Sequence, residues 1–265
     1  MVAIVTGHKG FIGRRLVEHL KEYQWDVYPF DVDMANALEQ FETYVQSCDV
    51  IFHVGAISDT TLQDPNEMLY WNYSTSKIIF DLAQKYDKKV IYSSSAACYG
   101  KGDGIPTNIY GWSKLLAEEY GMKACDKFVA LRYFNVYGPG EEDKGKMASV
   151  AYQAWKKGSF TLFPAAVGKP IKRDFIYIAD VIAANHLAVK CDKGVYDVGT
   201  GKAESFEDLV GGMGIEYDYH DESKIPSWYQ FYTQADKNKF MPGYEPMNNV
   251  KDSTRDYKKY LENQL

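Results

Sequence analysis

The chain has 265 residues, of which 46% are hydrophobic and 25% are charged. This suits either one large globular domain or one domain with an added lobe, and it excludes a disordered, collagen-like or coiled-coil protein. Thirty Lys and Arg against 36 Asp and Glu give a net charge of -6. Because nucleic acids and anionic membranes require a basic face, we expect neither as a partner.

The sequence indicates no targeting segment and no metal. No run approaches the roughly 18 apolar residues of a membrane helix, and the chain opens on a strand-like Met1-Val-Ala-Ile-Val. The cysteines (Cys48, Cys98, Cys125 and Cys191) are far apart, and the five histidines lack metal-ligand spacing. We therefore expect a reduced, cytoplasmic protein without a bound metal.

Strand-like and helix-like segments alternate over the first two-thirds of the chain. In chain order we expect a strand at 3–6, a helix at 11–23, a strand at 26–31, a helix at 35–47, a strand at 50–54, a helix at 66–86, a strand at 89–93, a helix at 109–123 and a strand at 128–133. This order predicts an α/β fold with a Rossmann-type doubly wound parallel sheet.

The rhythm changes after Pro139. A helix is expected at 147–157, strands at 174–178 and 194–198 around a helix at 178–189, and a last helix at 251–261. We expect residues 1–140 and 174–201 to form a dinucleotide-binding domain. Residues 141–173 and 202–265 should form a smaller mixed α/β lobe that binds substrate.

The strongest local motif lies between the first strand and the first helix. It reads Thr6-Gly7-His8-Lys9-Gly10-Phe11-Ile12-Gly13. Glycines there allow a tight turn and close approach of a pyrophosphate, which the helix N-terminus then attracts. The motif predicts a dinucleotide site that includes Gly7, Lys9, Gly10, Phe11, Ile12 and Gly13.

Two charged residues point to different dinucleotides. Asp31 ends the second strand, where a carboxylate accepts hydrogen bonds from ribose hydroxyls and repels a 2′-phosphate, which favours NAD. Lys9 favours NADP, because a cation there could meet that phosphate. The cofactor is therefore predicted as NAD or NADP.

A second group of residues carries the chemistry. Ser95 ends a serine-rich strand, and Tyr110 and Lys114 lie four residues apart on a predicted helix, so they share one face. A free phenol has a pKa near 10, and a nearby ammonium lowers it. We therefore expect a Tyr110 phenolate base tuned by Lys114, with Ser95 donating to the same substrate oxygen.

With these motifs, the first half of the chain resembles the extended short-chain dehydrogenase/reductases, the group of nucleotide-sugar epimerases and dehydratases. The matching residues are the glycine motif, Asp31, His53-x-Gly55-Ala56, Asn72, Ser95, Tyr110-x-x-x-Lys114 and Arg132-Tyr-Phe-Asn135-Val-Tyr-Gly-Pro139. The resemblance implies that Tyr110 is the acid/base, that Lys114 holds the nicotinamide ribose, and that Ser95 orients the substrate. It also implies that Gly55, Ala56 and Asn72 bind the cofactor.

The second half is similar to the ADP-glycero-manno-heptose 6-epimerase family. The matching blocks are Lys144-Gly-x-Met-Ala-Ser-Val-Ala151, Lys172-Arg-Asp-Phe-Ile-Tyr-Ile-x-Asp180, Gly199-Thr-Gly-x-Ala-Glu-Ser-Phe206 and Tyr229-Gln-x-x-Thr-Gln-Ala-Asp236. This implies a second acid/base at Lys144, facing Tyr110 across the sugar. The predicted substrate contacts are Ser95, Asn135, Lys144, Gln153 (where that family has His), Phe163, Arg173 and Tyr229.

The implied reaction is epimerisation of a nucleotide-diphosphate sugar, a lipopolysaccharide precursor, by transient oxidation to a carbonyl and re-reduction. A UDP-hexose 4-epimerase uses the same Ser, Tyr and Lys and is the main alternative. A nucleotide-sugar reductase is another, and a non-catalytic dinucleotide-binding scaffold is a further one. A dehydratase is disfavoured because Ala96-Ala97 follows Ser95. The resemblance also implies a homo-oligomer.

Overall fold

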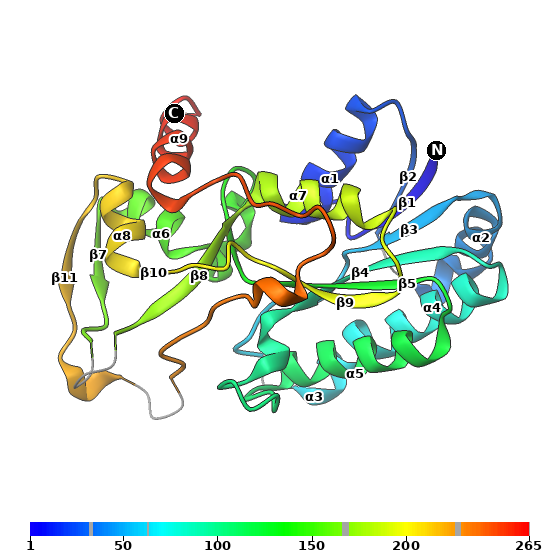
Figure 1. The fold of residues 1–265 in the computed structure, drawn as a ribbon, viewed down its shortest axis with the longest axis horizontal. Coiled ribbons are helices and arrows are strands. Elements are labelled where there is room, and N and C mark those ends of the chain that lie inside the picture. The colour runs from blue at the N-terminus through cyan, green and yellow to red at the C-terminus, as the bar shows by residue number, and fades with distance from the viewer. Residues whose placement is uncertain (32–33, 63, 166–169, 226–228, 265) are drawn as a thin grey trace. The chain divides into compact units, whose positions relative to one another are not determined.

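The computed structural model describes residues 1–31, 34–62, 64–165, 170–225 and 229–264 (Figure 1). Contacts divide the chain into two compact units. The first unit comprises Met1–Tyr133, Ile182–Tyr196 and Met241–Tyr244, and the second comprises Phe134–Val181, Asp197–Phe240 and Glu245–Leu265. Both units are therefore assembled from separate stretches of sequence.

The first unit is built on a six-stranded sheet with the order β2-β1-β3-β4-β5-β9. Its strands are β1 (Val2–Thr6), β2 (Asp26–Phe30), β3 (Val50–His53), β4 (Lys89–Ser95), β5 (Phe128–Tyr133) and β9 (Gly194–Val198). The pairings from β2 through β5 are parallel. The strands read as continuous apolar runs because helices cover both faces of the sheet. The expected Rossmann-type fold is confirmed.

Helices flank this sheet on either face (Figure 1). On one face lie α1 (Phe11–Glu22) and α7 (Ile178–Ala188), of which the part from Ile182 belongs to this unit. On the other lie α2 (Met34–Ser47), α4 (Thr75–Lys85) and α5 (Ile109–Ala124). Edge-to-face aromatic contacts of Phe80 with Tyr92 and Phe128 join α4 to the buried sheet.

The second unit holds two small sheets. One has the order β10-β8-β6, and the other pairs β11 with β7. Their bounds are β6 (Asn135–Tyr137), β8 (Lys172–Tyr177), β10 (Ala203–Ser205), β7 (Ser159–Leu162) and β11 (Glu216–Tyr219). Helices α6 (Val150–Lys157), α8 (Phe206–Gly212) and α9 (Val250–Glu262) pack with them around Tyr137, Phe175 and Tyr257.

The structure corrects several expected elements. The single helix expected at 66–86 is instead α3 (Pro65–Leu69), a π-helical turn η1 (Tyr70–Ser74) and α4. The helix expected from residue 147 starts at Val150, because residues Glu142–Met147 form the 3-10 segment η3. The short elements β6, β7, β10, α8 and β11 were not anticipated, since three to seven residues carry little periodic signal.

The boundaries between the two units differ from the domain boundaries predicted after residues 140, 173 and 201. The reason at the first change is that β6 pairs with β8, so the chain joins the second sheet directly after Tyr133. The functions assigned to the two predicted segments stay a prediction. Within the described stretches, no helix combines the length and the apolar character needed to span a membrane.

Candidate functional site

The glycine motif forms a cradle that only glycine can build. Gly7 has φ +68°, and a Cβ there would lie 2.5 Å from the Cα of Gly55. A Cβ on Gly13 would lie 2.2 Å from the Gly7 carbonyl oxygen. Strand β1, the end of β3 and helix α1 therefore meet at backbone contact distance.

Helix α1 presents its N-terminus at this cradle. The Gly10 amide donates to the Gly7 carbonyl at 3.0 Å, and Gly10 caps the helix without a side chain. Phe11 and Ile12 begin the helix. The backbone amides in the first turn of this 12-residue helix favour a phosphate. The cradle thus fits the pyrophosphate of a dinucleotide; contact of Gly7, Gly10 and Gly13 with a bound dinucleotide stays a prediction.

The two residues that pointed to different dinucleotides contact each other. Lys9 Nζ lies 3.0 Å from Asp31 Oδ2, with the side chains 74% and 38% exposed. An exposed ion pair of this kind contributes little to stability, so it separates at low cost. Lys9 therefore offsets the carboxylate that would repel a 2′-phosphate.

Asn72 ties the end of β3 to helix α5. Its side-chain oxygen accepts from the Ile57 amide at 2.7 Å, and its nitrogen donates to the Ile57 carbonyl at 2.9 Å and the Ser113 hydroxyl at 3.0 Å. Ser113 in turn donates to the Tyr110 carbonyl at 2.7 Å. Asn72 is fully buried and lies in η1, a type of turn frequent at functional sites. It holds the segment after Gly55 and Ala56; direct contact of Asn72 with cofactor stays a prediction.

A buried histidine that the sequence analysis treated only as part of a motif completes this support. His53 lies between the hydroxyls of Thr6, at 2.7 Å, and Ser76, at 2.8 Å. Burial, together with the charge of Lys114, lowers the pKa of His53 to about 3, so its ring is neutral. Since Ser76 donates to the Asn72 carbonyl at 2.6 Å, it accepts from His53 Nε2, and Thr6 donates to Nδ1. The His53-x-Gly-Ala motif was the signal for this chain of hydrogen bonds.

The predicted catalytic residues of the first unit lie together. Ser95 is the last residue of β4, and its side chain acts to lower the pKa of Tyr110, which lies near the start of α5. Lys114 follows one turn later, only 2% exposed, with its Nζ 4.4 Å above the Tyr92 ring. Because the strands are parallel, Ser95 lies at the same edge of the sheet as the glycine cradle.

The expected lowering of the Tyr110 pKa is wrong for the chain without a bound cofactor. Burial raises the pKa of Tyr110 to about 12, although Ser95 acts to lower it. Burial also lowers the pKa of Lys114 to about 8. Desolvation disfavours both charged forms and outweighs the attraction expected between them. Tyr110 is therefore a phenol that can donate a proton at neutral pH.

A buried ion pair fixes the helix that carries these residues. Glu118, on α5 one turn after Lys114, receives hydrogen bonds from Arg132 of β5 at 2.5 and 3.0 Å and from Ser94 at 2.6 Å. Glu118 is 1% exposed. This carboxylate is thus paired with Arg132, and α5 is anchored to strands β4 and β5. Sequence analysis treated Arg132 only as part of a motif and missed Glu118.

In the second unit, three predicted substrate residues cluster. The rings of Phe163 and Tyr229 have centroids 5.2 Å apart, and the Arg173 guanidinium lies 5.4 Å from the Tyr229 ring. Arg173 is 7% exposed and donates to the carbonyls of Lys172 and Gln230. Burial lowers the pKa of Arg173, and among the described residues no carboxylate pairs with it. A buried cation without an acidic partner favours an anionic ligand.

The other predicted substrate residues lie elsewhere in this unit. Lys144 is half-buried in η3, and burial lowers its pKa while Glu141 acts to raise it. Gln153 of α6 donates to the carbonyls of Ala148, at 2.7 Å, and Lys146, at 3.3 Å. Asn135 is exposed at the start of β6. Their contact with substrate stays a prediction.

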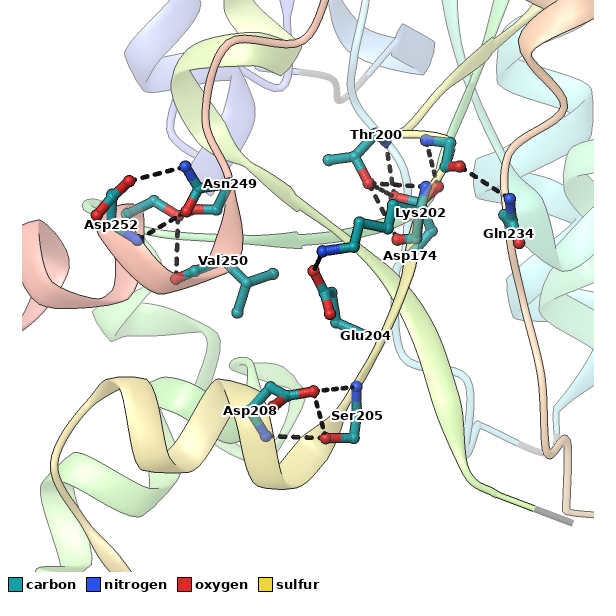
Figure 2. Close-up of polar contacts among 12 residues, drawn as sticks. Asp174, Thr200, Lys202, Glu204, Ser205, Asp208, Gln234, Asn249, Val250 and Asp252 are labelled. Atoms are coloured by element: carbon teal, nitrogen blue, oxygen red, sulfur yellow. Dashed lines mark hydrogen bonds and ion pairs between the residues drawn. The ribbon is translucent and has the colours of Figure 1, made fainter.

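Asp174, beside Arg173 on β8, is an anchor that the sequence did not reveal. Its carboxylate accepts from the Thr200 amide and hydroxyl, the Gly201 amide and the Ala235 amide at 2.7–3.0 Å. Figure 2 shows this cluster, with Gln234 donating to the Gly201 carbonyl beside it. The carboxylate thereby holds β8 against the segments after β9 and before η5 (Lys237–Lys239).

Comparison with known proteins agrees with these arrangements. Residues 3–199 match the model of the NAD dependent epimerase/dehydratase family, and the chain belongs to that family. Its predicted class, an isomerase that uses a nicotinamide dinucleotide, is confirmed.

Solved structures show the same fold. ADP-L-glycero-D-manno-heptose-6-epimerase of Helicobacter pylori has a TM-score of 0.83 at 27% identity, covering 98% of this chain and 96% of that one. UDP-N-acetylglucosamine 4-epimerase of Methanobrevibacter ruminantium has a TM-score of 0.86 at 24% identity, covering 100% of this chain and 98% of that one. UDP-glucose 4-epimerase of Thermotoga maritima has a TM-score of 0.84 at 23% identity, covering 100% of this chain and 99% of that one. The last two likenesses establish the fold alone.

Proposed function

We propose that this chain is a nucleotide-sugar epimerase that inverts the sixth sugar carbon of ADP-glycero-manno-heptose. The observation that carries the proposal is that Ser95 ends β4, at the sheet edge that also bears the glycine cradle, and that Tyr110, whose pKa Ser95 acts to lower, shares α5 with buried Lys114. That arrangement combines a proton donor with a dinucleotide site. The motifs shared with the heptose 6-epimerases, and the likeness at 27% identity, favour the heptose as substrate.

The cofactor would be held by residues of the first unit. Gly7, Gly10, Gly13, Phe11 and Ile12 would bind the pyrophosphate, and Asp31 or Lys9 the adenosine ribose. Gly55, Ala56, Asn72, Tyr110 and Lys114 would complete the site. A dinucleotide held by these residues would supply reversible hydride transfer to and from the substrate.

The chain's own residues would move the proton. Tyr110 or Lys144 takes the proton of a carbinol as it becomes a carbonyl, and one of them returns a proton when the carbonyl is reduced on its other face. A pKa of about 12 leaves Tyr110 protonated before cofactor binds, so positive charge next to it is needed for the base form. The lowered pKa of Lys144 supports its role as the second acid/base, because a larger fraction of its amine is neutral.

Arg173, with Lys172 and Lys144, would neutralise the diphosphate of the sugar donor. The support is that Arg173 is buried without a described acidic partner, beside the Phe163 and Tyr229 rings. Further proposals from the resemblance are contacts of Ser95, Asn135 and Gln153 with the sugar. They also include self-association, a cytoplasmic location and a product that serves as a lipopolysaccharide precursor.

A UDP-hexose 4-epimerase is the second candidate. Ser95, Tyr110 and Lys114 would serve it equally, and two such 4-epimerases share the fold. The sugar carbon that is oxidised depends on how the sugar lies against Tyr110, which these three residues do not determine.

The test is NMR of the purified protein with ADP-D-glycero-D-manno-heptose, UDP-glucose or UDP-N-acetylglucosamine, with and without added NAD or NADP. Inversion at the sixth carbon of the heptose alone is expected. Tyr110→Phe should lose at least about 10³-fold in rate while binding dinucleotide as the wild type does. Conversion of a UDP-hexose alone would support the 4-epimerase, and full activity of Tyr110→Phe would reject both.

A further inference from the structure

We propose that Glu141 is a positioning residue for Lys144: its carboxylate closes the loop that carries Lys144 and acts on the charge of the Lys144 amine. The proposal rests on the acid/base role proposed for Lys144. Glu141 stands immediately before η3 and is fully buried. Charged side chains are rarely buried without a specific set of partners, and those of Glu141 define its role.

The carboxylate of Glu141 joins the two ends of the loop. Its Oε1 accepts from the Gly138 amide at 3.0 Å, which lies before the loop. The same carboxylate accepts from the Ser149 hydroxyl at 2.8 Å and the Ser149 amide at 2.5 Å, which lie after it. Residues 139–148 are thus closed by one side chain, and Lys144 lies within that span.

Other contacts hold the interior of the loop. The Lys144 amide donates to the Glu141 carbonyl at 3.0 Å, and the Ala148 amide donates to the Gly145 carbonyl at 3.2 Å. Gln153 donates from α6 to the carbonyls of Lys146 and Ala148. Ser149 also accepts from the Tyr152 amide at 3.2 Å, so the closing contact is continuous with the start of α6. The backbone that carries Lys144 is therefore fixed from both sides.

The same carboxylate acts on the charge of Lys144. Burial lowers the pKa of Lys144, and Glu141 is the group that acts to raise it. Reciprocally, burial raises the pKa of Glu141, and its hydrogen bonds and Lys144 act to lower it. The other titratable groups facing Glu141 are Tyr137 of β6 and Tyr257 of α9, whose pKa values are raised by burial first and by Glu141 among other causes. Both tyrosines are neutral at physiological pH, so Lys144 is the group whose charge responds to Glu141.

The test is a titration of the Lys144 side chain by NMR in cofactor-loaded protein, with the resonance assigned by its absence in Lys144→Arg. Glu141→Gln keeps the size of the side chain but removes the charge. We expect it to lower the pKa of Lys144 by about 0.5–1 unit and to slow epimerisation about 10- to 100-fold. The matched control is Glu142→Gln, which removes the adjacent carboxylate of the same loop and should leave the Lys144 titration unchanged.

An unchanged Lys144 titration in folded Glu141→Gln would overturn the proposal, as would an equal shift in the control. If Glu141→Gln does not fold, Glu141→Asp serves instead, since it withdraws the carboxylate by one methylene. It should shift the titration in the same direction by less and reduce the rate, and no change in either would reject the proposal. A shifted titration together with a fully active Lys144→Met would uphold the coupling and reject only the acid/base role of Lys144.

Discussion

The contact between Lys9 and Asp31 predicts how the chain selects its dinucleotide. Replacing Asp31 by Asn removes a carboxylate that would accept hydrogen bonds from the ribose hydroxyls of NAD, while nearly preserving its size. Replacing Lys9 by Met removes the cation 3.0 Å away from it. The two single variants and the double variant form a cycle that separates the two effects.

The magnitudes follow from charge and exposure. A 2′-phosphate carries nearly two charges, and its repulsion by a carboxylate about 5 Å away in a water-like dielectric is about 1–2 kcal/mol. Asp31→Asn should therefore increase the affinity for NADP about tenfold. The same variant should bind NAD about tenfold or more weakly, because a hydrogen bond to a charged group is worth about 1.5–3 kcal/mol. The preference between the two dinucleotides should then change by about 10²-fold or more.

Lys9→Met should act mainly on NADP. The exposed pair with Asp31 is worth about 0–1 kcal/mol, so NAD binding should change by less than about fivefold. NADP should bind about tenfold more weakly, because its 2′-phosphate would meet Asp31 without the cation.

Calorimetric titration of protein freed of retained dinucleotide, at about 0.05 M and 0.3 M salt, measures these affinities. The effects on NADP should shrink at the higher salt. If Asp31→Asn leaves the ratio of NAD to NADP affinity unchanged, the second strand does not end at the adenosine ribose, and the reasoning is wrong.

Two further predictions concern the first unit. Gly13→Ala places a Cβ 2.2 Å from the Gly7 carbonyl oxygen and should cost about 1–3 kcal/mol of stability and at least tenfold in dinucleotide affinity. The control is Gly211→Ala in helix α8 of the second unit, where an added Cβ has nothing within 4 Å. It should raise the free energy of unfolding by at most about 1 kcal/mol and leave dinucleotide binding unchanged, and equal behaviour of the two variants would contradict the cradle. His19 and His186 hydrogen-bond at 2.9 Å, and burial lowers the pKa of both, with further lowering by His186 for His19 and by Lys190 for His186. Their contribution to stability is present above the unfolded pKa of about 6.5 and is lost as pH falls below it. The melting temperature should therefore fall more steeply from pH 7 to 5 in the wild type than in the double variant His19→Gln/His186→Gln. Parallel curves of melting temperature against pH would refute this.

The sequence was sufficient for the part of the fold in which local patterns and global structure agree. The glycine motif between an apolar strand and an amphipathic helix identified the cradle, and the order of elements predicted the parallel sheet. The four-residue spacing of Tyr110 and Lys114 placed both on α5. These features depend on residues close together in the chain, so their pattern is visible without tertiary contacts.

The features that escaped prediction depend on contacts between distant residues. The π-helical turn that breaks the expected helix at 66–86 centres on Asn72, which bonds to Ile57 and Ser113. The direction of the Tyr110 pKa shift depends on burial, which no spacing reports. Glu141 and Asp174 looked like ordinary charged residues, and only their buried donors show that they are anchors.

The distribution of buried charge argues that the candidate site is arranged for an anionic ligand. The chain is acidic overall, with a net charge of -6, yet Lys114 and Arg173 are almost wholly buried. The buried carboxylates close to them in sequence have other partners, since Glu118 pairs with Arg132 and Asp174 accepts from backbone amides and a hydroxyl. Burial therefore lowers the pKa of each cation without full compensation. The diphosphate of a nucleotide sugar would supply the missing charge next to Arg173, so binding of that ligand should stabilise the protein as well as position the substrate.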